Sequence, residues 1–118
     1  MAAVELIAVC ASAQLVDGGT GVRFRLADDP FAVGGFAVRC AGRVAGYLNR
    51  CAHQPMELDW IAGHFFDAGG TRLVCATHGA EYDAVSGHCR GGPCSGRGLQ
   101  PLAMVEQDGI VYWKRSTP

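Results

Sequence analysis

Two short pairs of cysteine and histidine stand out among the residues that can do chemistry. The first pair is Cys51 and His53, separated by one residue, and the second is Cys75 and His78, separated by two. Thiolate and imidazole at such spacings can both reach one metal centre from a single turn. Together the pairs offer two sulfurs and two nitrogens, and tetrahedral zinc is one centre that accepts such a set.

The residues after the second pair form a more specific pattern. Gly79, Tyr82-Asp83 and Ser86-Gly87 follow His78, and Gly91-Gly92-Pro93 comes shortly afterwards. With the two Cys/His pairs, this pattern resembles the Rieske iron–sulfur family, in which C-x-H and C-x-x-H-G loops are followed by a glycine–proline loop. The flanking hairpins fit as well, so the resemblance covers most of the chain. Zinc binding alone gives no reason for these surroundings.

The resemblance implies one [2Fe–2S] cluster and a role for each ligand. Cys51 and Cys75 would bind one iron as thiolates, and His53 and His78 would bind the other through imidazole nitrogens. Neutral imidazoles in place of two thiolates make the reduced cluster easier to form, so the histidine-bound iron is expected to accept the electron. The chain would then be an electron carrier and not an enzyme by itself. Its expected partners are a flavin-dependent reductase as donor and the terminal component of an oxygenase as acceptor.

Three alternative functions remain open at this point. The chain could be a small subunit or domain of an NAD(P)H nitrite reductase-like enzyme, a regulatory or redox-sensing module, or a zinc-stabilised interaction module. A standalone oxygenase is not expected, because its mononuclear iron needs a further 2-His-1-carboxylate set in a larger domain. The sequence also shows no Rossmann glycine fingerprint and no P-loop.

Two departures from the respiratory branch of the family favour the soluble ferredoxin branch. Met56 and Thr77 stand where each ligand loop of the respiratory proteins carries an extra cysteine, so a disulfide between those loops is not expected. Ala80 stands where those proteins have a serine that donates to a bridging sulfide. Tyr82 is retained at the position of the tyrosine that donates to a cysteine sulfur in those proteins. One missing donor predicts a potential in the lower part of the Rieske range.

The chain has six cysteines, and we expect all of them to be reduced. Cys10 and Cys40 fall in strand patterns, where a thiol acts as a small buried hydrophobe. Cys89 follows the second ligand loop, and Cys94 lies in the glycine–proline loop, close to the expected cluster. In a reducing compartment such residues bind metal or stay inert more often than they form disulfides.

Strand patterns at both ends of the chain must position these loops. The expected strands are residues 5–9, 22–26, 36–40, 43–48, 104–107 and 110–113. In the strand at residues 22–26, Arg23 is expected on the solvent-exposed face. Ala41-Gly42 and Asp108-Gly109 are the expected hairpin turns. Between Arg50 and Gly98 only short strand pieces are expected, at 65–66, 72–74 and 88–89, and no helix of ordinary length. The resemblance implies an all-β Rieske fold of stacked antiparallel sheets with a small loop-rich cluster-binding subdomain.

The bulk properties limit the organisation and the partners. A chain of 118 residues is expected to be one domain, residues 1–118, with the cluster-binding insertion at about 50–98. A net charge of −1 argues against nucleic-acid binding. No apolar run is long enough to span a bilayer, and the N-terminus lacks the basic region of a signal peptide, so we expect a cytoplasmic protein with no membrane partner.

The remaining aromatic and histidine residues are given ordinary roles. His64 and His88 are expected at the surface, because neither belongs to a paired loop. Trp60, Phe65 and Phe66 are expected to pack in the core rather than to form a docking patch.

Overall fold

The computed structural model describes residues 3–26, 33–51, 57–59, 61–76, 79–94 and 96–117. Within these ranges the chain is built from β-strands and one 3₁₀ turn, η1 (Ser12–Gln14), and has no α-helix. The predicted all-β class is therefore confirmed. In the same part of the chain, no helix is long and apolar enough to cross a bilayer.

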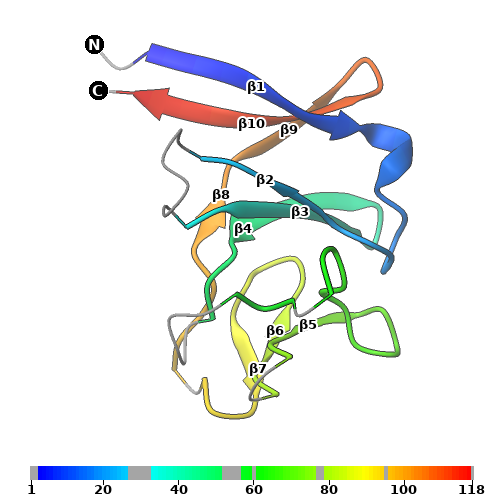
Figure 1. Cartoon of the computed structure of the whole chain (residues 1–118), viewed down its shortest axis with the longest axis vertical. Coiled ribbons are helices and arrows are strands. Elements are labelled where there is room, and N and C mark those ends of the chain that lie inside the picture. The colour runs from blue at the N-terminus through cyan, green and yellow to red at the C-terminus, as the bar shows by residue number, and fades with distance from the viewer. Residues whose placement is uncertain are drawn as a thin grey trace.

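The strands form three antiparallel sheets that follow one another along the long axis of the molecule (Figure 1). The first sheet contains, in spatial order, β1 (Ala3–Ala11), β10 (Ile110–Thr117) and β9 (Met104–Gln107). The second contains β2 (Val22–Phe24), β3 (Gly35–Cys40), β4 (Arg43–Leu48) and β8 (Pro101–Leu102). The third contains β5 (Arg72–Val74), β6 (Glu81–Asp83) and β7 (Cys89–Gly91).

Both predicted hairpin turns are confirmed. Ala41 and Gly42 join β3 to β4 with φ angles of 52° and 76°, and Asp108 and Gly109 join β9 to β10 with 51° and 78°. Positive φ at both central residues matches the right-handed twist of the flanking strands, which is why glycine and aspartate are favoured there. The turns fix the strand register on which the loop region is mounted.

Strand β3 lies between the two hydrophobic cores of the molecule. Its side chains alternate, so Phe36 and Val38 join the core shared with the third sheet, whereas Ala37 joins the core under the first sheet. All three are fully buried. A strand covered on both faces has no polar positions in its centre, as the sequence of β3 shows.

Two contacts attach the loop region to the second sheet. The Phe36 and Phe65 rings stack with their centroids 3.9 Å apart. The Tyr47 hydroxyl donates a hydrogen bond to the Ala84 carbonyl oxygen at 2.9 Å. Burial raises the pKa of Tyr47 to about 12, so the phenol keeps the proton that it donates. The core is thus continuous from the strand scaffold into the loop region.

Some sequence-based boundaries were wrong. The second strand ends at Phe24 rather than at residue 26, and Phe66 makes only an isolated bridge, to Leu73. Strands β6 and β8 were not predicted at all. Each has at most three residues, and β6 carries acidic residues on both sides of its buried tyrosine, so neither shows a periodic pattern.

Candidate metal centre

Cys51 and Cys75, the two predicted thiolate ligands, are both buried in the same hydrophobic core. Cys51 comes three residues after the end of β4, and Cys75 directly follows β5. Their exposed fractions are 3% and 0%, and both belong to the core shared by the second and third sheets. Residues far apart in sequence thus contribute two cysteines to one core.

Backbone hydrogen bonds close the chain around the second ligand position. The Cys75 amide donates to the Ala80 carbonyl at 2.9 Å, and the Gly79 amide donates to the Cys75 carbonyl at 2.9 Å. Gly79 has a φ of +73°, a conformation that favours glycine. A glycine is therefore needed here to turn the chain from Cys75 back into β6.

The tyrosine predicted to donate to a cysteine sulfur is in place. Tyr82 lies on β6, is fully buried, and has its hydroxyl oxygen 3.3 Å from the Cys51 sulfur. With Cys51 as a thiolate, the hydroxyl would be the donor. Ala80, at the position of the missing serine, is also fully buried and offers no side-chain donor.

The glycine–proline loop packs directly on the second ligand loop. A Cβ atom at Gly92 would lie 2.9 Å from the Gly79 carbonyl oxygen and 3.0 Å from the Ala80 Cα atom. Gly92 also has a φ of +81°. Only glycine allows the two backbones to come this close, so the loop covers the segment that follows Cys75.

Sequence reasoning missed a buried polar network that supports both ligand positions. Arg23 of β2 lies on an exposed face, as predicted, but its Nε and Nη2 atoms also donate to the two carboxylate oxygens of Asp59 at 2.8 and 2.7 Å. Asn49 Nδ2 donates to the same carboxylate at 3.0 Å, and the Gly63 amide donates to it at 2.9 Å. No sequence signal pairs residues 23 and 59, which lie 36 positions apart.

This network connects the scaffold to both loops. Asn49 lies two residues before Cys51, and its side-chain oxygen accepts a hydrogen bond from the Leu58 amide at 3.0 Å. The Leu58 carbonyl in turn accepts from the Ala76 amide, next to Cys75, at 2.9 Å. A displacement of Asn49 or Leu58 would therefore shift the backbone next to both Cys51 and Cys75.

Asp59 is ionised in this setting. Burial disfavours the charged form, but the hydrogen bonds from Arg23, Asn49 and Gly63 outweigh it, so the pKa of the carboxyl lies below its usual value. The Asp59 side chain is 0% exposed, whereas that of Arg23 is 38% exposed. The buried charge is therefore compensated by hydrogen bonds and by a partner in contact with water.

Several predicted residues fall outside the described part of the chain. These include the two predicted imidazole ligands, His53 and His78, together with Met56, Thr77 and Trp60. Among the described residues, no group of three or more His, Cys, Asp or Glu side chains is placed to bind a metal.

The ordinary roles given to the other histidine and aromatic residues are confirmed where they are described. His64 and His88 are exposed, Phe65 is buried, and Phe66 packs against the same core. Cys10 and Cys40 are partly buried and pack against the two cores.

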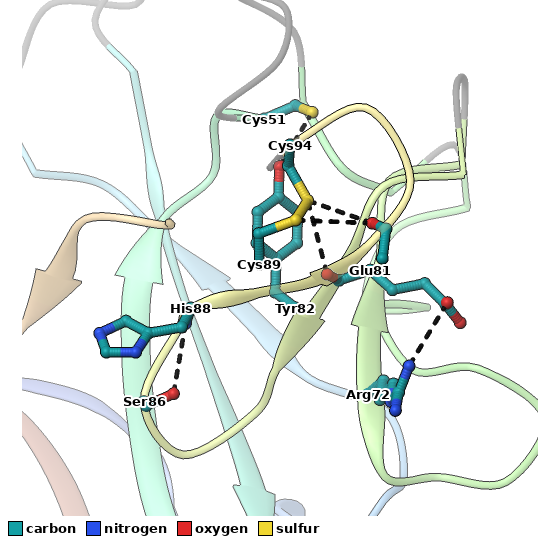
Figure 2. Close-up of a disulfide and its surroundings, with 9 residues drawn as sticks. Cys51, Arg72, Glu81, Tyr82, Ser86, His88, Cys89 and Cys94 are labelled. Atoms are coloured by element: carbon teal, nitrogen blue, oxygen red, sulfur yellow. Dashed lines mark hydrogen bonds and ion pairs between the residues drawn. A yellow bond between two sulfur atoms is a disulfide. The ribbon is translucent and has the colours of Figure 1, made fainter. Parts of the chain in front are cut away.

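The expectation that all six cysteines are reduced is wrong. Cys89 and Cys94 form a disulfide, which Figure 2 shows beside the ring of Tyr82. The chain reverses at Gly92 and brings the two Cα atoms to 5.6 Å, a separation that a disulfide can span. The prediction rested on a reducing compartment and on the absence of a cysteine pair between the two ligand loops. It did not consider a disulfide between two cysteines five residues apart.

The described residues fit the cysteine side of an iron–sulfur centre. Two buried cysteines share one core, and a buried tyrosine hydroxyl lies within hydrogen-bonding distance of one of the sulfurs. A buried thiolate needs such compensation unless a metal carries its charge. Sulfur ligands on two loops, a hydroxyl donor and a covering glycine loop are the surroundings that a cluster with thiolate ligands requires.

Comparisons with known proteins agree with this geometry. The family model of the Rieske [2Fe-2S] domain matches residues 5–111. No protein of curated function matches the sequence significantly.

Solved structures with a similar fold include three from ferredoxin systems. The Sphingomonas yanoikuyae B1 ferredoxin superposes with a TM-score of 0.73 at 21% identity, covering 94% of this chain and 99% of that one. The ferredoxin of carbazole 1,9a-dioxygenase from Nocardioides aromaticivorans IC177 gives 0.70 at 21% identity, covering 92% and 95%. A chain from the complex of reduced oxygenase and oxidized ferredoxin in carbazole 1,9a-dioxygenase gives 0.72 at 21% identity, covering 92% and 91%.

Proposed function

This chain belongs to the Rieske [2Fe-2S] domain family, and we propose that it is a one-electron carrier whose cluster is bound by Cys51, His53, Cys75 and His78. The observation that carries the proposal is the burial of Cys51 and Cys75 in one core, with the Tyr82 hydroxyl 3.3 Å from the Cys51 sulfur. A [2Fe–2S] cluster supplies reversible storage of one electron.

The protein residues would set where the electron sits and how stable it is. Cys51 and Cys75 would bind one iron as thiolates, inside the core. His53 and His78 would bind the other iron with neutral imidazoles, which favours that iron as the site of reduction. The Tyr82 hydroxyl would donate to the Cys51 sulfur and so favour the more negative, reduced state.

We further propose a flavin-dependent reductase as the donor and an oxygenase component as the acceptor. Support comes from the likeness in fold to ferredoxins, one of them seen with the oxygenase of carbazole 1,9a-dioxygenase. The likeness in fold extends over 94% of this chain and 99% of the Sphingomonas yanoikuyae B1 ferredoxin, which supports the carrier role. The cytoplasm is the compartment that we propose, because cluster assembly needs the Cys51 and Cys75 thiols reduced.

The ligand proposal is tested by the metal content of purified protein and of matched variants. Protein made under iron-replete conditions should contain iron and acid-labile sulfide in equal amounts, about two of each per chain, as a [2Fe–2S] centre requires. Cys75→Ser and His78→Ala should each lose the cluster. The chain's four histidines provide the control, because His64→Ala and His88→Ala change exposed residues and should leave the metal content unchanged. Stoichiometric zinc without sulfide, or loss of iron in the control variants, would contradict the ligand set.

The carrier role is tested separately from cluster binding. The loaded protein alone should neither oxidise NADH nor reduce nitrite. With a flavin-dependent ferredoxin reductase and NADH, it should mediate reduction of cytochrome c at a rate proportional to its concentration. Nitrite reduction by the isolated chain would show that it is an enzyme and overturn the proposal.

A further inference from the structure

The Cys89–Cys94 disulfide closes a small ring at the edge of the cluster-binding region. Cys89 is the first residue of β7, and Cys94 lies in the turn that follows the strand. Within the ring, Gly92 reverses the chain with a φ of +81°. The ring therefore contains the part of the glycine–proline loop that packs on the second ligand loop.

The two cysteines of this disulfide differ in exposure. Cys94 is fully buried, and its sulfur lies 3.2 Å from the Gly91 carbonyl oxygen and 3.6 Å from the Glu81 carbonyl oxygen. Cys89 is partly exposed. A thiolate attacks one sulfur of a disulfide while the other leaves, so we expect an external thiol to attack Cys89, the more exposed residue, and to release Cys94.

The ring packs against residues that are adjacent to the two predicted thiolate ligands. Gly92 packs against the backbone of Gly79 and Ala80, which follows Cys75. Cys89 pairs with Tyr82 across the β6–β7 ladder, and the hydroxyl of Tyr82 lies 3.3 Å from the Cys51 sulfur. Figure 2 shows Cys51, Tyr82 and the disulfide together at this end of the core. Opening the disulfide ring would therefore alter the packing of the glycine–proline loop over the predicted cluster site.

We propose that Cys89–Cys94 is a thiol–disulfide exchange site, reduced by a dithiol protein of the thioredoxin class, and that its state controls access to the cluster. The reductant's first thiolate attacks the Cys89 sulfur, which forms a mixed disulfide and releases Cys94 as a thiolate that takes up a proton. The reductant's second thiol then attacks the reductant's first sulfur in the mixed disulfide. This attack releases Cys89 as a thiolate, which also takes up a proton. Two electrons and two protons pass to the pair, and the reductant becomes a disulfide.

Reduction would loosen the loop without unfolding it. The Arg97 amide still donates to the Cys94 carbonyl at 2.9 Å, and the Cys89 amide still donates to the Arg97 carbonyl at 3.0 Å. The chain-entropy model limits the gain in loop opening to about 40-fold for a ring of this length. Because these hydrogen bonds remain, we expect a smaller effect, of about tenfold.

The test uses the loaded wild-type protein under anaerobic conditions, before and after incubation with thioredoxin kept reduced by its NADPH-dependent reductase. Alkylation after acid denaturation, read by mass spectrometry, should label four of the six cysteines in the untreated protein and all six afterwards. In parallel, bathophenanthroline disulfonate reports the rate at which iron is released. This rate should rise about tenfold on reduction of the disulfide.

Two variants control the interpretation. In Cys89→Ser/Cys94→Ser, iron release should be fast from the start and unaffected by thioredoxin. Cys10→Ser removes a cysteine next to the other core and should behave as the wild type does.

Six labelled cysteines in untreated protein, a disulfide that thioredoxin leaves intact, or an unchanged release rate after reduction would each overturn the inference. An equal effect of thioredoxin on the double variant would overturn it as well. The inference rests on the proposed cluster, so protein that binds no iron and sulfide would overturn both. Loaded protein that fails the test overturns only the exchange site.

Discussion

Replacing Asp59 with Asn should destabilise the protein strongly, although the two side chains have nearly the same shape. Each carboxylate oxygen of Asp59 accepts two hydrogen bonds. Arg23 Nη2 and Asn49 Nδ2 donate to Oδ1, while Arg23 Nε and the Gly63 amide donate to Oδ2. An asparagine NH₂ group would face two donors in either orientation of the amide. The substitution therefore breaks an ion pair and leaves buried donors unsatisfied.

The magnitude follows from the burial of the two partners. Breaking a fully buried ion pair costs about 3–5 kcal/mol. The Asp59 side chain is 0% exposed, but that of Arg23 is 38% exposed, so water can solvate the guanidinium once it is released. We therefore expect a loss at the low end, of about 3 kcal/mol. With a urea m-value of about 1.5 kcal/mol/M, the midpoint of unfolding should fall by about 2 M.

Urea titration of loaded protein under argon, followed by far-ultraviolet circular dichroism, measures this shift. The matched control is Glu106→Gln, which removes the charge of a more exposed carboxylate, paired with Arg39 in the other half of the molecule. That control should shift the midpoint much less. An Asp59→Asn midpoint equal to that of the control would refute the argument from burial.

The same variant makes a prediction about pH. The pKa of Asp59 is lowered in the folded protein, so its contribution to stability is complete above the usual carboxyl pKa of about 4. The contribution is lost as the pH falls through the lowered pKa. The difference in urea midpoint between wild type and Asp59→Asn should therefore be constant near neutral pH and shrink below about pH 4.

Three further changes probe the candidate centre. Ala80→Ser places a hydroxyl at a fully buried position beside the second ligand loop and should raise the reduction potential by about 40 mV, measured by protein-film voltammetry. Tyr82→Phe removes the hydroxyl that lies 3.3 Å from the Cys51 sulfur and should lower the potential by about 40 mV in the same experiment; no change would show that this hydroxyl does not act on the cluster. Gly92→Ala adds a Cβ atom 2.9 Å from the Gly79 carbonyl oxygen at a φ of +81°, so it should destabilise the covering loop by about 2 kcal/mol and speed iron release to a chelator. A release rate equal to that of wild type would show that the loop accommodates the methyl group.

Local signals were sufficient to predict the two hairpins of the scaffold. The hairpin turns at Ala41-Gly42 and Asp108-Gly109 need positive φ, and their residue types show this. The alternation of large apolar residues around them gives strands β3, β4, β9 and β10 within one or a few residues. Strand β6 could not be found this way, because three residues are held there by pairing with β5 and β7 rather than by their own pattern.

The candidate site was predicted only where spacing carries information. The motifs around Cys51 and Cys75 are specific enough in residue type and spacing to indicate the family, which the family model confirms, whereas the ligand assignment stays a prediction. The Arg23–Asp59 pair was missed because its two residues come from distant segments, which no local pattern relates. The Cys89–Cys94 disulfide was missed because cysteine connectivity depends on how the chain turns back in space, which spacing alone does not determine.

The central claim is most directly tested by the electron paramagnetic resonance spectrum of the purified protein after reduction with dithionite. Mixed ligation by Cys51, Cys75, His53 and His78 predicts a rhombic signal whose average g-value lies below that of a [2Fe–2S] cluster with four cysteine ligands. The signal should integrate to one spin for every two irons. A spectrum typical of all-cysteine ligation, or a silent sample containing zinc, would contradict the account.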